Sequence, residues 1–208
     1  MFEYKNIIDI SLPLDEKTIV YPGDPLLTME KIKSAGGFQL TKLSFGTHFG
    51  SHIDAPSHVF DSGKNLNELP LDNFIGPCRV LDVRECDESV SKESLEKFNI
   101  VAGERILLKT KSSERGYTEF YKDYVYLSSD AAQYLADKNI KLIGIDYFSV
   151  KQKGSLDNTP HTAFLEKNIP ILESINLASV EAGEYFLMAA PLALQSVDGS
   201  PVRALLLK

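Results

Sequence analysis

Three of the four histidines in the chain lie within eleven residues, in the segment HFGSHIDAPSH. They are His48, His52 and His58, and Asp54 adds a carboxylate between them. The resulting pattern, H-x3-H-x-D-x3-H, combines imidazole and carboxylate groups, which are ligand types that suit divalent ions such as zinc or manganese. Because four histidines scattered at random would rarely cluster in this way, the segment is the first candidate for a functional site.

Regular secondary structure cannot direct all four of these side chains at one ion. On a single helix, Asp54 and His58 would point roughly 120° and 80° away from His48. On an extended strand, His48 and Asp54 would lie about 20 Å apart, whereas ligand bonds to a metal are about 2 Å long. We therefore expect the segment to curl. Residues that interrupt regular structure are suitably placed for this, namely Gly46, Gly50 and Pro56.

The fourth histidine, His161, stands 12 residues before Glu173 in HTAFLEKNIPILE. A helix over 160–167 and a short strand over 170–172 would return the chain and bring the two side chains together. Taken alone the pair is weak, since a lone histidine at a helix start is commonly solvated or capping. Together with the first cluster it makes six candidate groups, more than the four that close a structural zinc site. Six groups suit two metals bridged by one carboxylate, or one metal with an open position beside a free acid/base.

Two non-catalytic interpretations of the first cluster remain open. It could be a surface loop with fortuitous histidines, or a structural metal site. Structural zinc often uses cysteine, but neither Cys78 nor Cys86 is near the cluster in sequence. The spacing of these two cysteines fits neither a CxxC pair nor a disulfide framework. We expect both to be free, structural thiols in a reducing compartment.

Composition excludes several classes of function. The chain has 208 residues, of which 43% are hydrophobic. Its formal charge of −7 argues against binding to nucleic acid, because phosphates attract positively charged surfaces. Its longest nearly apolar run, 185–194, is shorter than the roughly 20 residues of a membrane span and contains Pro191. The amino terminus shows no secretory signal, which makes a cytoplasmic location the expectation. With no repeat or linker visible, we expect residues 1–208 to form a single domain.

Short apolar runs between turn residues predict a chain rich in strands. The expected strands are 6–12, 26–32, 38–45, 78–84, 105–110, 125–127, 142–146, 185–189 and 202–207. Ser91 and Ser129 are expected to cap two helices, and Thr159 followed by Pro160 predicts the start of a third. Gly199 and Pro201 are expected to form the turn before the last strand. The predicted fold class is mixed α/β, with a barrel-like or layered sheet flanked by helices.

The histidine segment resembles the HxGTHxDxPxH signature of the metal-dependent cyclase and kynurenine formamidase family, with Ser51 in place of the usual Thr. The opening DISLPLDEKTIVYPGDP, the strand GIDYFSV and the closing DGSPVRAL are similar to further segments of that family. His161 and Glu173 fall where its second metal pair stands. The resemblance therefore extends over nearly the whole chain.

This resemblance implies a metal-dependent amidohydrolase on a swivelling β/β/α fold, assembled as a homodimer or larger homo-oligomer. It implies two ions, usually zinc, with manganese as the other possibility. One ion would be held by His48, His52 and Asp54, and the second by Asp54, His161 and Glu173. Asp54 would bridge the two ions.

The same resemblance implies that His58 stays off the metals and acts as acid/base, and that Tyr21 in VYPGD binds substrate. Kynurenine formamidases often carry Trp at the position of Tyr21, and a tyrosine ring can also stack on an aryl group. The implied substrate is a small amide, with an aryl formamide such as N-formylkynurenine the best single match. A cyclic-amide hydrolase of the isatin-opening kind and a non-catalytic metal-binding module are the alternatives. For Arg203 we expect a surface or interface ion pair rather than a substrate contact.

Overall fold

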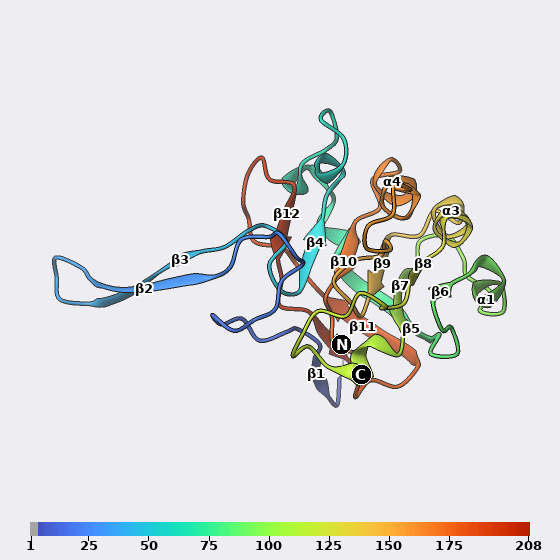
Figure 1. Ribbon diagram of the computed structural model, residues 1–208, viewed down its shortest axis with the longest axis horizontal. Helices are drawn as coiled ribbons and strands as arrows, with labels where there is room; N and C mark the ends of the chain where they lie inside the picture. The colour runs from blue at the N-terminus through green and yellow to red at the C-terminus, as the bar shows by residue number, and fades with distance from the viewer. Residues whose placement is uncertain (1–3) are drawn as a thin grey trace.

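The computed structural model describes residues 4–208 and confirms a mixed α/β fold rich in strands (Figure 1). Nine strands form one sheet in the order β1-β13-β11-β5-β7-β9-β10-β4-β12. Two separate pairs, β2 with β3 and β6 with β8, complete the strands of the described residues. Among residues 4–208, no helix has the length and apolar character of a membrane span.

The centre of the sheet is parallel. Strands β5 (Ile75–Asp82), β7 (Arg105–Lys109), β9 (Leu142–Ile145) and β10 (Ile171–Glu173) run side by side in the same direction. Every residue of β7 and β9 is buried, as the continuous apolar runs RILL and LIGI predict for strands covered on both faces. The expected strands 105–110 and 142–146 are therefore confirmed to within one residue.

The two flanks of the sheet are antiparallel. On one side, β11 (Gly183–Met188), β13 (Leu205–Leu207) and β1 (Ile7–Asp9) follow β5. On the other, β4 (His52–Asp54) pairs with β10, and β12 (Gly199–Pro201) closes the edge.

The histidine segment curls as expected, with a turn at Gly50 and a 3₁₀ turn from Pro56, around the three-residue strand β4. One sequence-based expectation is wrong on this flank. Gly199 and Pro201 lie in a strand instead of a turn, and Pro201 is tolerated because β12 is an edge strand that pairs only with β4. The expected strand 202–207 is correspondingly shortened to β13.

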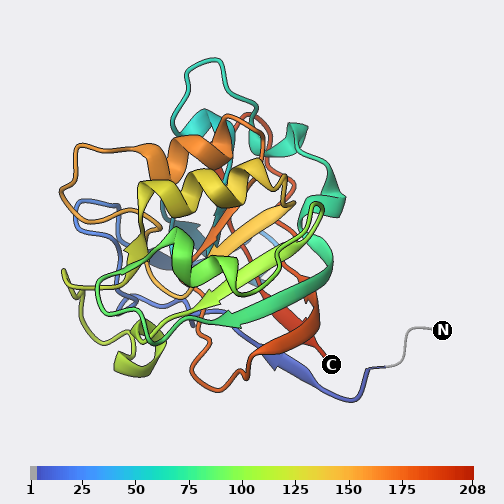
Figure 2. The same ribbon diagram turned by 90° about the vertical axis from the view of Figure 1, so that its right-hand side faces the viewer.

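Helices cover one face of the sheet, where α1 (Lys92–Glu96), α3 (Ser129–Asp137) and α4 (Thr159–Leu165) lie in a layer (Figure 2). The hydroxyl of Ser91 caps α1, as predicted, by accepting from the Ser94 backbone N–H. The cap of α3 is Ser128 rather than Ser129. Helix α4 begins at Thr159 and ends two residues before the predicted end, and Asn158 precedes it as its cap.

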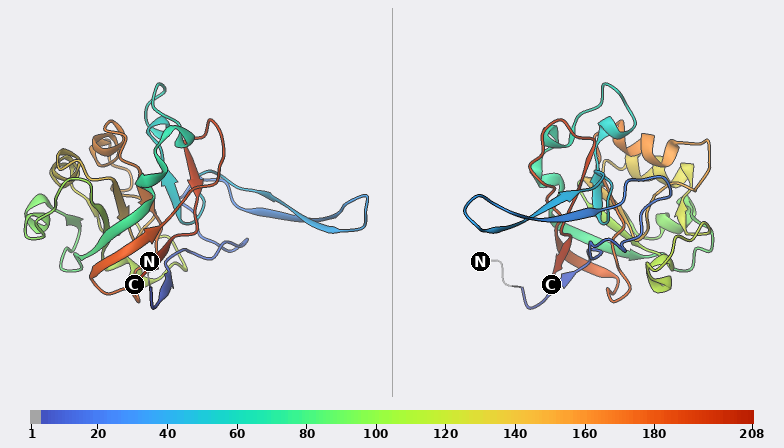
Figure 3. Two further views of the ribbon diagram at one scale, coloured as in Figure 1. Left: turned by 180° about the vertical axis from the view of Figure 1, so that it is seen from behind. Right: turned by 60° about the vertical axis from the view of Figure 1, so that its left-hand side comes forward.

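The remaining elements are short or stand apart. Helix α2 (Ser112–Arg115) follows β7, and β6 (Ser89–Val90) pairs with β8 (Tyr126–Leu127) in parallel. Three 3₁₀ turns, η1 (Pro56–His58), η2 (Leu66–Glu68) and η3 (Leu71–Asn73), lie between β4 and β5. The hairpin of β2 (Thr28–Lys33) and β3 (Gln39–Ser44) projects from the body of the molecule (Figure 3).

Two apolar clusters hold the layers together. One fills the space between the sheet and the helices and includes Leu108, Leu135, Ile145 and Phe164. The other lies on the opposite face of the sheet around Phe74, Leu107 and Leu206. Cys78 and Cys86 are buried and free, as predicted. The sheet strands are thus fixed on both faces, and β4 and β10 present their polar residues from a rigid base.

Candidate metal centre

Strands β4 and β10 place three of the predicted ligands in direct proximity. His52 and Asp54 alternate along β4 and share one face, while Ile53 points into the core. Glu173 of β10 stands opposite His52 in the antiparallel register. His52 Nε2 lies 3.3 Å from Asp54 Oδ1 and 3.7 Å from Glu173 Oε2. All three side chains are buried.

The backbone turn before β4 orients His52. Gly50 has φ of +66°, a backbone conformation that favours glycine, and a Cβ there would lie 2.1 Å from Leu14 Cδ2. The Gly50 carbonyl accepts a hydrogen bond of 2.8 Å from His52 Nδ1. Since a carbonyl only accepts, this bond assigns the proton to Nδ1 and leaves the Nε2 lone pair facing the carboxylates.

His48 bridges two carboxylates. Its Nδ1 lies 2.7 Å from Asp54 Oδ1 and its Nε2 lies 2.9 Å from Asp198 Oδ2. Burial lowers the pKa of His48, but the neighbouring carboxylates outweigh that effect and raise it to about 10. Without another cation present, the carboxylates therefore keep a proton on this ring.

His161 completes the group from the start of α4. Its Nε2 lies 3.5 Å from Glu173 Oε1 and 3.9 Å from Asp54 Oδ2, so the structure brings together the pair separated by 12 residues in sequence. Burial lowers the pKa of His161, but the Glu173 and Asp54 carboxylates raise it above its usual value. The Val150 backbone N–H donates a 2.7 Å hydrogen bond to Glu173 Oε1 and fixes that carboxylate.

His58 lies at the rim, at the end of η1. Its ring centroid is 4.1 Å from that of His48 and 5.9 Å from that of His161. Its Nδ1 is 3.6 Å from Asp198 Oδ2, and its side chain is one third exposed. Of the predicted residues, it has the freest access to a molecule entering from solvent.

The donor set fits divalent metal. Asp54 Oδ2 is buried without a hydrogen-bond partner within residues 4–208, a costly arrangement unless a cation binds there. Among the residues that the structure describes, two groups of potential ligand atoms lie close enough to hold an ion, and both contain Asp54. They are His48, Asp54 and His58, and His52, Asp54 and Glu173. In the described part of the chain, no Lys or Arg forms an ion pair with Asp54 or Glu173, so these buried carboxylates lack a positive side chain of that kind.

Sequence reasoning missed Asp198, which lies between His48 and His58. It precedes β12, and its Oδ1 accepts a 2.9 Å hydrogen bond from the Thr47 hydroxyl. The His48 hydrogen bond, which outweighs its partial burial, holds the pKa of Asp198 well below its usual value. The only signal in the sequence was its place in the DGSPVRAL segment, which was interpreted as a turn and terminal strand.

Ser51 stands where the resembled signature has Thr, and its buried hydroxyl connects two backbone segments beside the site. Its hydroxyl accepts from the Leu12 backbone N–H at 2.8 Å and donates to the Ser174 carbonyl at 2.5 Å. Ser174 follows Glu173 and has φ of +58°. One hydroxyl thus links the amino-terminal segment to the end of β10, and a hydroxyl is the feature that serine and threonine share.

A cavity of about 450 Å³ opens over the histidines. Tyr21 and Phe148 line it together with the charged Lys151 and Asp24. The Tyr21 ring packs edge-on against Phe120, 5.4 Å between centroids, and Lys153 Nζ lies 4.0 Å from the Tyr21 centroid. Tyr21 therefore belongs to the wall of the site.

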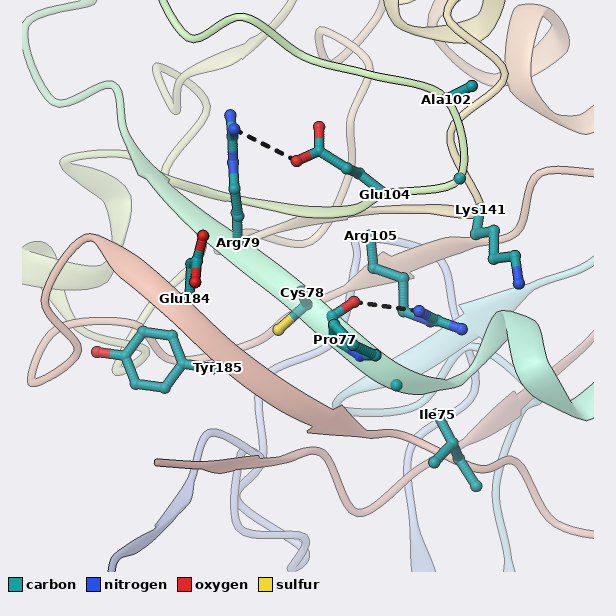
Figure 4. A pocket seen from close by; sticks show the side chains of 12 residues that line it. Ile75, Pro77, Cys78, Arg79, Ala102, Glu104, Arg105, Lys141, Glu184 and Tyr185 are labelled. Carbon is teal, nitrogen blue, oxygen red and sulfur yellow. Dashed lines mark hydrogen bonds and ion pairs between the residues drawn. The ribbon is translucent and has the colours of Figure 1, made fainter. Parts of the chain in front are cut away.

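A second cavity, of about 520 Å³, lies over β5, β7 and β11, away from the histidines (Figure 4). Arg79 pairs with Glu104 at 3.3 Å, and the Arg105 guanidinium donates to the Pro77 carbonyl at 3.1 Å. Burial raises the pKa of the Cys78 thiol to about 12, which keeps it protonated and unreactive. In this cavity Arg79, Glu104, Arg105 and Lys141 each have a polar partner in the chain, whereas Asp54 Oδ2 in the histidine site has no hydrogen-bond partner within residues 4–208.

Arg203 lines neither of these two cavities. Its side chain is 74% exposed and forms an ion pair with Asp9 of β1. The expected surface ion pair is present.

The chain is similar to several known proteins. Residues 8–152 match the family described as "Putative cyclase". The chain is 39% identical over 202 residues to a "Kynurenine formamidase" of Bacillus anthracis, with 96% of each chain covered. A solved "Potential Metal-Dependent Hydrolase With Cyclase Activity" superposes with a TM-score of 0.88 at 29% identity, with 97% of each chain covered. An isatin hydrolase bound to thioisatinate shares the fold, with a TM-score of 0.83, 24% identity, and coverage of 97% of this chain and 92% of the other.

Proposed function

Since the chain belongs to the cyclase family, we propose that it is a metal-dependent amidohydrolase in which residues 1–208 act as one domain, with an aryl formamide such as N-formylkynurenine as substrate. The observation that carries the metal requirement is Asp54 Oδ2, which is buried without a hydrogen-bond partner within residues 4–208 and belongs to a residue shared by two groups of potential ligands. The formamide assignment rests on curated relatives that match along nearly the whole chain. The free, buried thiols fit a cytoplasmic location.

We assign two ions to the site, zinc first and manganese second. His48, His52 and Asp54 would hold one, while Asp54, His161 and Glu173 would hold the other, with Asp54 shared. When bound, the ions would supply a water of lowered pKa and polarise the amide carbonyl. The donor types support this choice, since imidazole and carboxylate suit both metals.

His58 is the acid/base of the proposed reaction. Attack of water on the formyl carbon releases one proton, and cleavage of the C–N bond requires one proton on the departing amine nitrogen. His58 takes the first proton and returns it to the nitrogen, so that formamide and water become an amine and formic acid, which then loses a proton to solvent as formate. Its position at the rim, with Asp198 beside Nδ1, supports this role because the ring faces the cavity.

The cavity walls fit an aryl group. Tyr21 and Phe148 supply aromatic surface, and about 450 Å³ is within the usual range of small-molecule pockets. The opposite charges of Lys151 and Asp24 on the same walls suit a substrate that bears a carboxylate or an ammonium group.

The experiment is steady-state hydrolysis of N-formylkynurenine by the metal-replete protein, by the chelated protein, and after zinc or manganese is restored. The proposal expects a kcat/KM of at least about 10⁴ M⁻¹s⁻¹ that disappears with the chelator and returns with the metal. Turnover that survives complete metal removal would reject the metal-dependent mechanism.

The second candidate is a cyclic-amide hydrolase, which is favoured by the shared fold of the isatin hydrolase. Testing isatin beside N-formylkynurenine separates the two. Opening of isatin with negligible formamide cleavage would replace the first assignment and leave the metal centre in place. Bound metal without turnover of any linear or cyclic amide would indicate a non-catalytic metal-binding module.

A further inference from the structure

The segment that joins α2 to β8 is rich in aromatic side chains. Residues 117–124 have the sequence YTEFYKDY, so half of these positions are Tyr or Phe, against 10% aromatic residues in the whole chain. They form neither helix nor strand, and we call them the aromatic strap. None of them lines the cavity over the histidines. The proposed reaction therefore leaves the aromatic content of the strap unexplained.

Two tyrosine hydroxyls tie the ends of the strap to the segments that carry the site. At its start, the Tyr117 hydroxyl donates to the Ile175 carbonyl at 2.7 Å, two residues after Glu173 of β10. At its end, the Tyr124 hydroxyl donates to the carbonyl of Lys151, which lines the cavity. The Tyr124 side chain is itself buried. The strap is therefore held in a fixed position relative to the cavity.

Phe120, at the middle of the strap, lies behind the cavity wall. Its ring centroid is 5.4 Å from that of Tyr21, with the ring planes at 80°, and 5.8 Å from that of Phe148. Tyr21 and Phe148 line the cavity, whereas Phe120 does not. Aromatic pairs prefer offset or edge-on arrangements with centroids about 4.5 to 7 Å apart, as found here. Phe120 therefore supports both aromatic walls from outside the cavity.

Lys153 contacts the same tyrosine ring. Its ammonium nitrogen lies 4.0 Å from the Tyr21 centroid and 5.7 Å from the Phe120 centroid. A cation at this distance is attracted by the negative face of the ring. Lys153, like Phe120, is not among the residues that line the cavity. The Tyr21 ring is thus held by two side chains from outside the cavity, while the ring itself contributes to the wall.

We infer that Phe120 and Lys153 are positioning residues that give the site its preference for a flat aryl group, because they hold the Tyr21 ring at a fixed angle. Immobilising a side chain during binding costs affinity, and a wall that is already fixed avoids this cost. An aryl ring can pack on such a wall, whereas a saturated ring of the same size is thicker and fits less well. The inference rests on the proposed function in taking this cavity as the substrate site.

Two ketones that differ only in the flatness of the ring test the inference. Isothermal titration calorimetry of the metal-replete protein compares acetophenone with cyclohexyl methyl ketone, neither of which contains an amide bond. The wild type should bind acetophenone more tightly. Phe120→Leu should reduce that preference by about two- to tenfold, the range for loss of one aromatic pair, and Lys153→Met should reduce it in the same direction. Phe120→Tyr keeps the ring and should keep the preference.

Tyr134→Leu is the matched control. Like Phe120, Tyr134 is an aromatic residue of intermediate exposure, but it lies on α3 and does not line the cavity. Its replacement should leave the preference unchanged. Circular dichroism of each variant shows whether it is folded. Lys153→Met keeps the test decisive if Phe120→Leu does not fold, because Lys153 lies in a turn and outside the apolar clusters.

Kinetics with formanilide give a second measurement. Phe120→Leu should raise KM and change kcat less than twofold, because the proposed metal ligands and His58 are untouched. A wild type that binds both ketones equally, or an aryl preference that survives in the folded Phe120 and Lys153 variants, would overturn the inference. Absence of formanilide turnover, with the aryl preference present in the wild type and reduced in the variants, would reject the formamide assignment and leave the inference supported.

Discussion

Asp198 Oδ2 lies 2.9 Å from His48 Nε2, although the two residues are 150 positions apart in sequence. The contact arises because β12, which follows Asp198, pairs with β4 at the edge of the sheet. Gly199 permits the approach, since a Cβ there would lie 2.9 Å from His48 Cε1 and 2.8 Å from the Ile53 carbonyl oxygen. A carboxylate on one nitrogen of a histidine fixes the orientation of the ring and the placement of its proton. Asp198 is thus the positioning residue for His48.

Replacing Asp198 should weaken metal binding without removing a proposed ligand. We expect Asp198→Asn to lower metal affinity by about 10- to 100-fold, the usual cost of losing a hydrogen-bonded partner of a ligand. Competition with a chromogenic chelator measures that affinity. Thr47→Val, which removes only the donor to Asp198 Oδ1, should have a smaller effect. An Asp198→Asn protein with wild-type affinity would show that His48 does not need this carboxylate.

His58→Ala should retain metal and lose activity. General acid/base catalysis contributes about 10²- to 10⁴-fold, so kcat should fall by that range. His58 is one third exposed and near Asp198 Oδ2, yet it also lies within a group of three potential ligands. Elemental analysis beside kinetics therefore decides its role. Loss of one ion from the variant would make His58 a ligand and contradict the acid/base assignment.

Lys151→Met should alter substrate preference rather than chemistry. Lys151 lines the cavity, and its ammonium group donates to the Asn158 side-chain oxygen. We expect kcat/KM for N-formylkynurenine, which bears a carboxylate, to fall about tenfold, as for loss of one charge-assisted contact. The neutral substrate formanilide, measured with the same variant, serves as the control. Equal losses for both substrates would argue against carboxylate recognition.

Ser51 gives a matched pair of substitutions. Ser51→Ala leaves the Leu12 N–H and the Ser174 carbonyl without their buried partner, which should cost about 1 to 3 kcal/mol of unfolding free energy. Ser51→Thr keeps the hydroxyl and should be close to neutral. Urea unfolding of the metal-free proteins measures both. If alanine and threonine were equally tolerated, the hydroxyl bridge would not be what this position requires.

Most of the candidate site could be proposed from the sequence because histidine is rare in this chain and three of its four histidines lie at short spacing. Four histidines in 208 residues leave few combinations, and His161 and Glu173 met as the predicted helix and strand implied. The place of Asp198 in the site was not predicted, because aspartate before glycine is common and usually indicates a turn. Its role depends on the pairing of β12 with β4, which is a long-range contact without a local pattern.

The fold shows the same division between local and long-range information. Strands β7 and β9 were predictable from continuous apolar runs that are buried on both faces. The hairpin strands were also predicted, at 26–32 and 38–45, but their complete exposure was not. A strand's apolar content indicates that it must be covered, and leaves open whether the cover comes from the same chain or from another copy.

Asp146 should make the stability of this protein depend on pH. Burial raises its pKa to about 7, although hydrogen bonds from Thr110 and Ser113 act to lower it. The folded state therefore holds the proton more tightly than the unfolded chain, whose carboxyl titrates near 3.8. This contribution to stability is complete below about pH 4 and is lost as the pH rises to about 7.

Asp146→Asn removes that titration while keeping the shape of the side chain. Relative to the wild type, the unfolding free energy of the variant should therefore increase between pH 5 and pH 8, by an amount on the order of 1 to 3 kcal/mol. Urea titrations of both metal-free proteins at the two pH values give the difference directly. Paired carboxylates elsewhere, such as Asp198, affect both proteins alike and cancel in the comparison. A difference that stays constant between pH 5 and pH 8 would mean that Asp146 is already ionised in the folded protein at pH 5, held so by its hydrogen bonds.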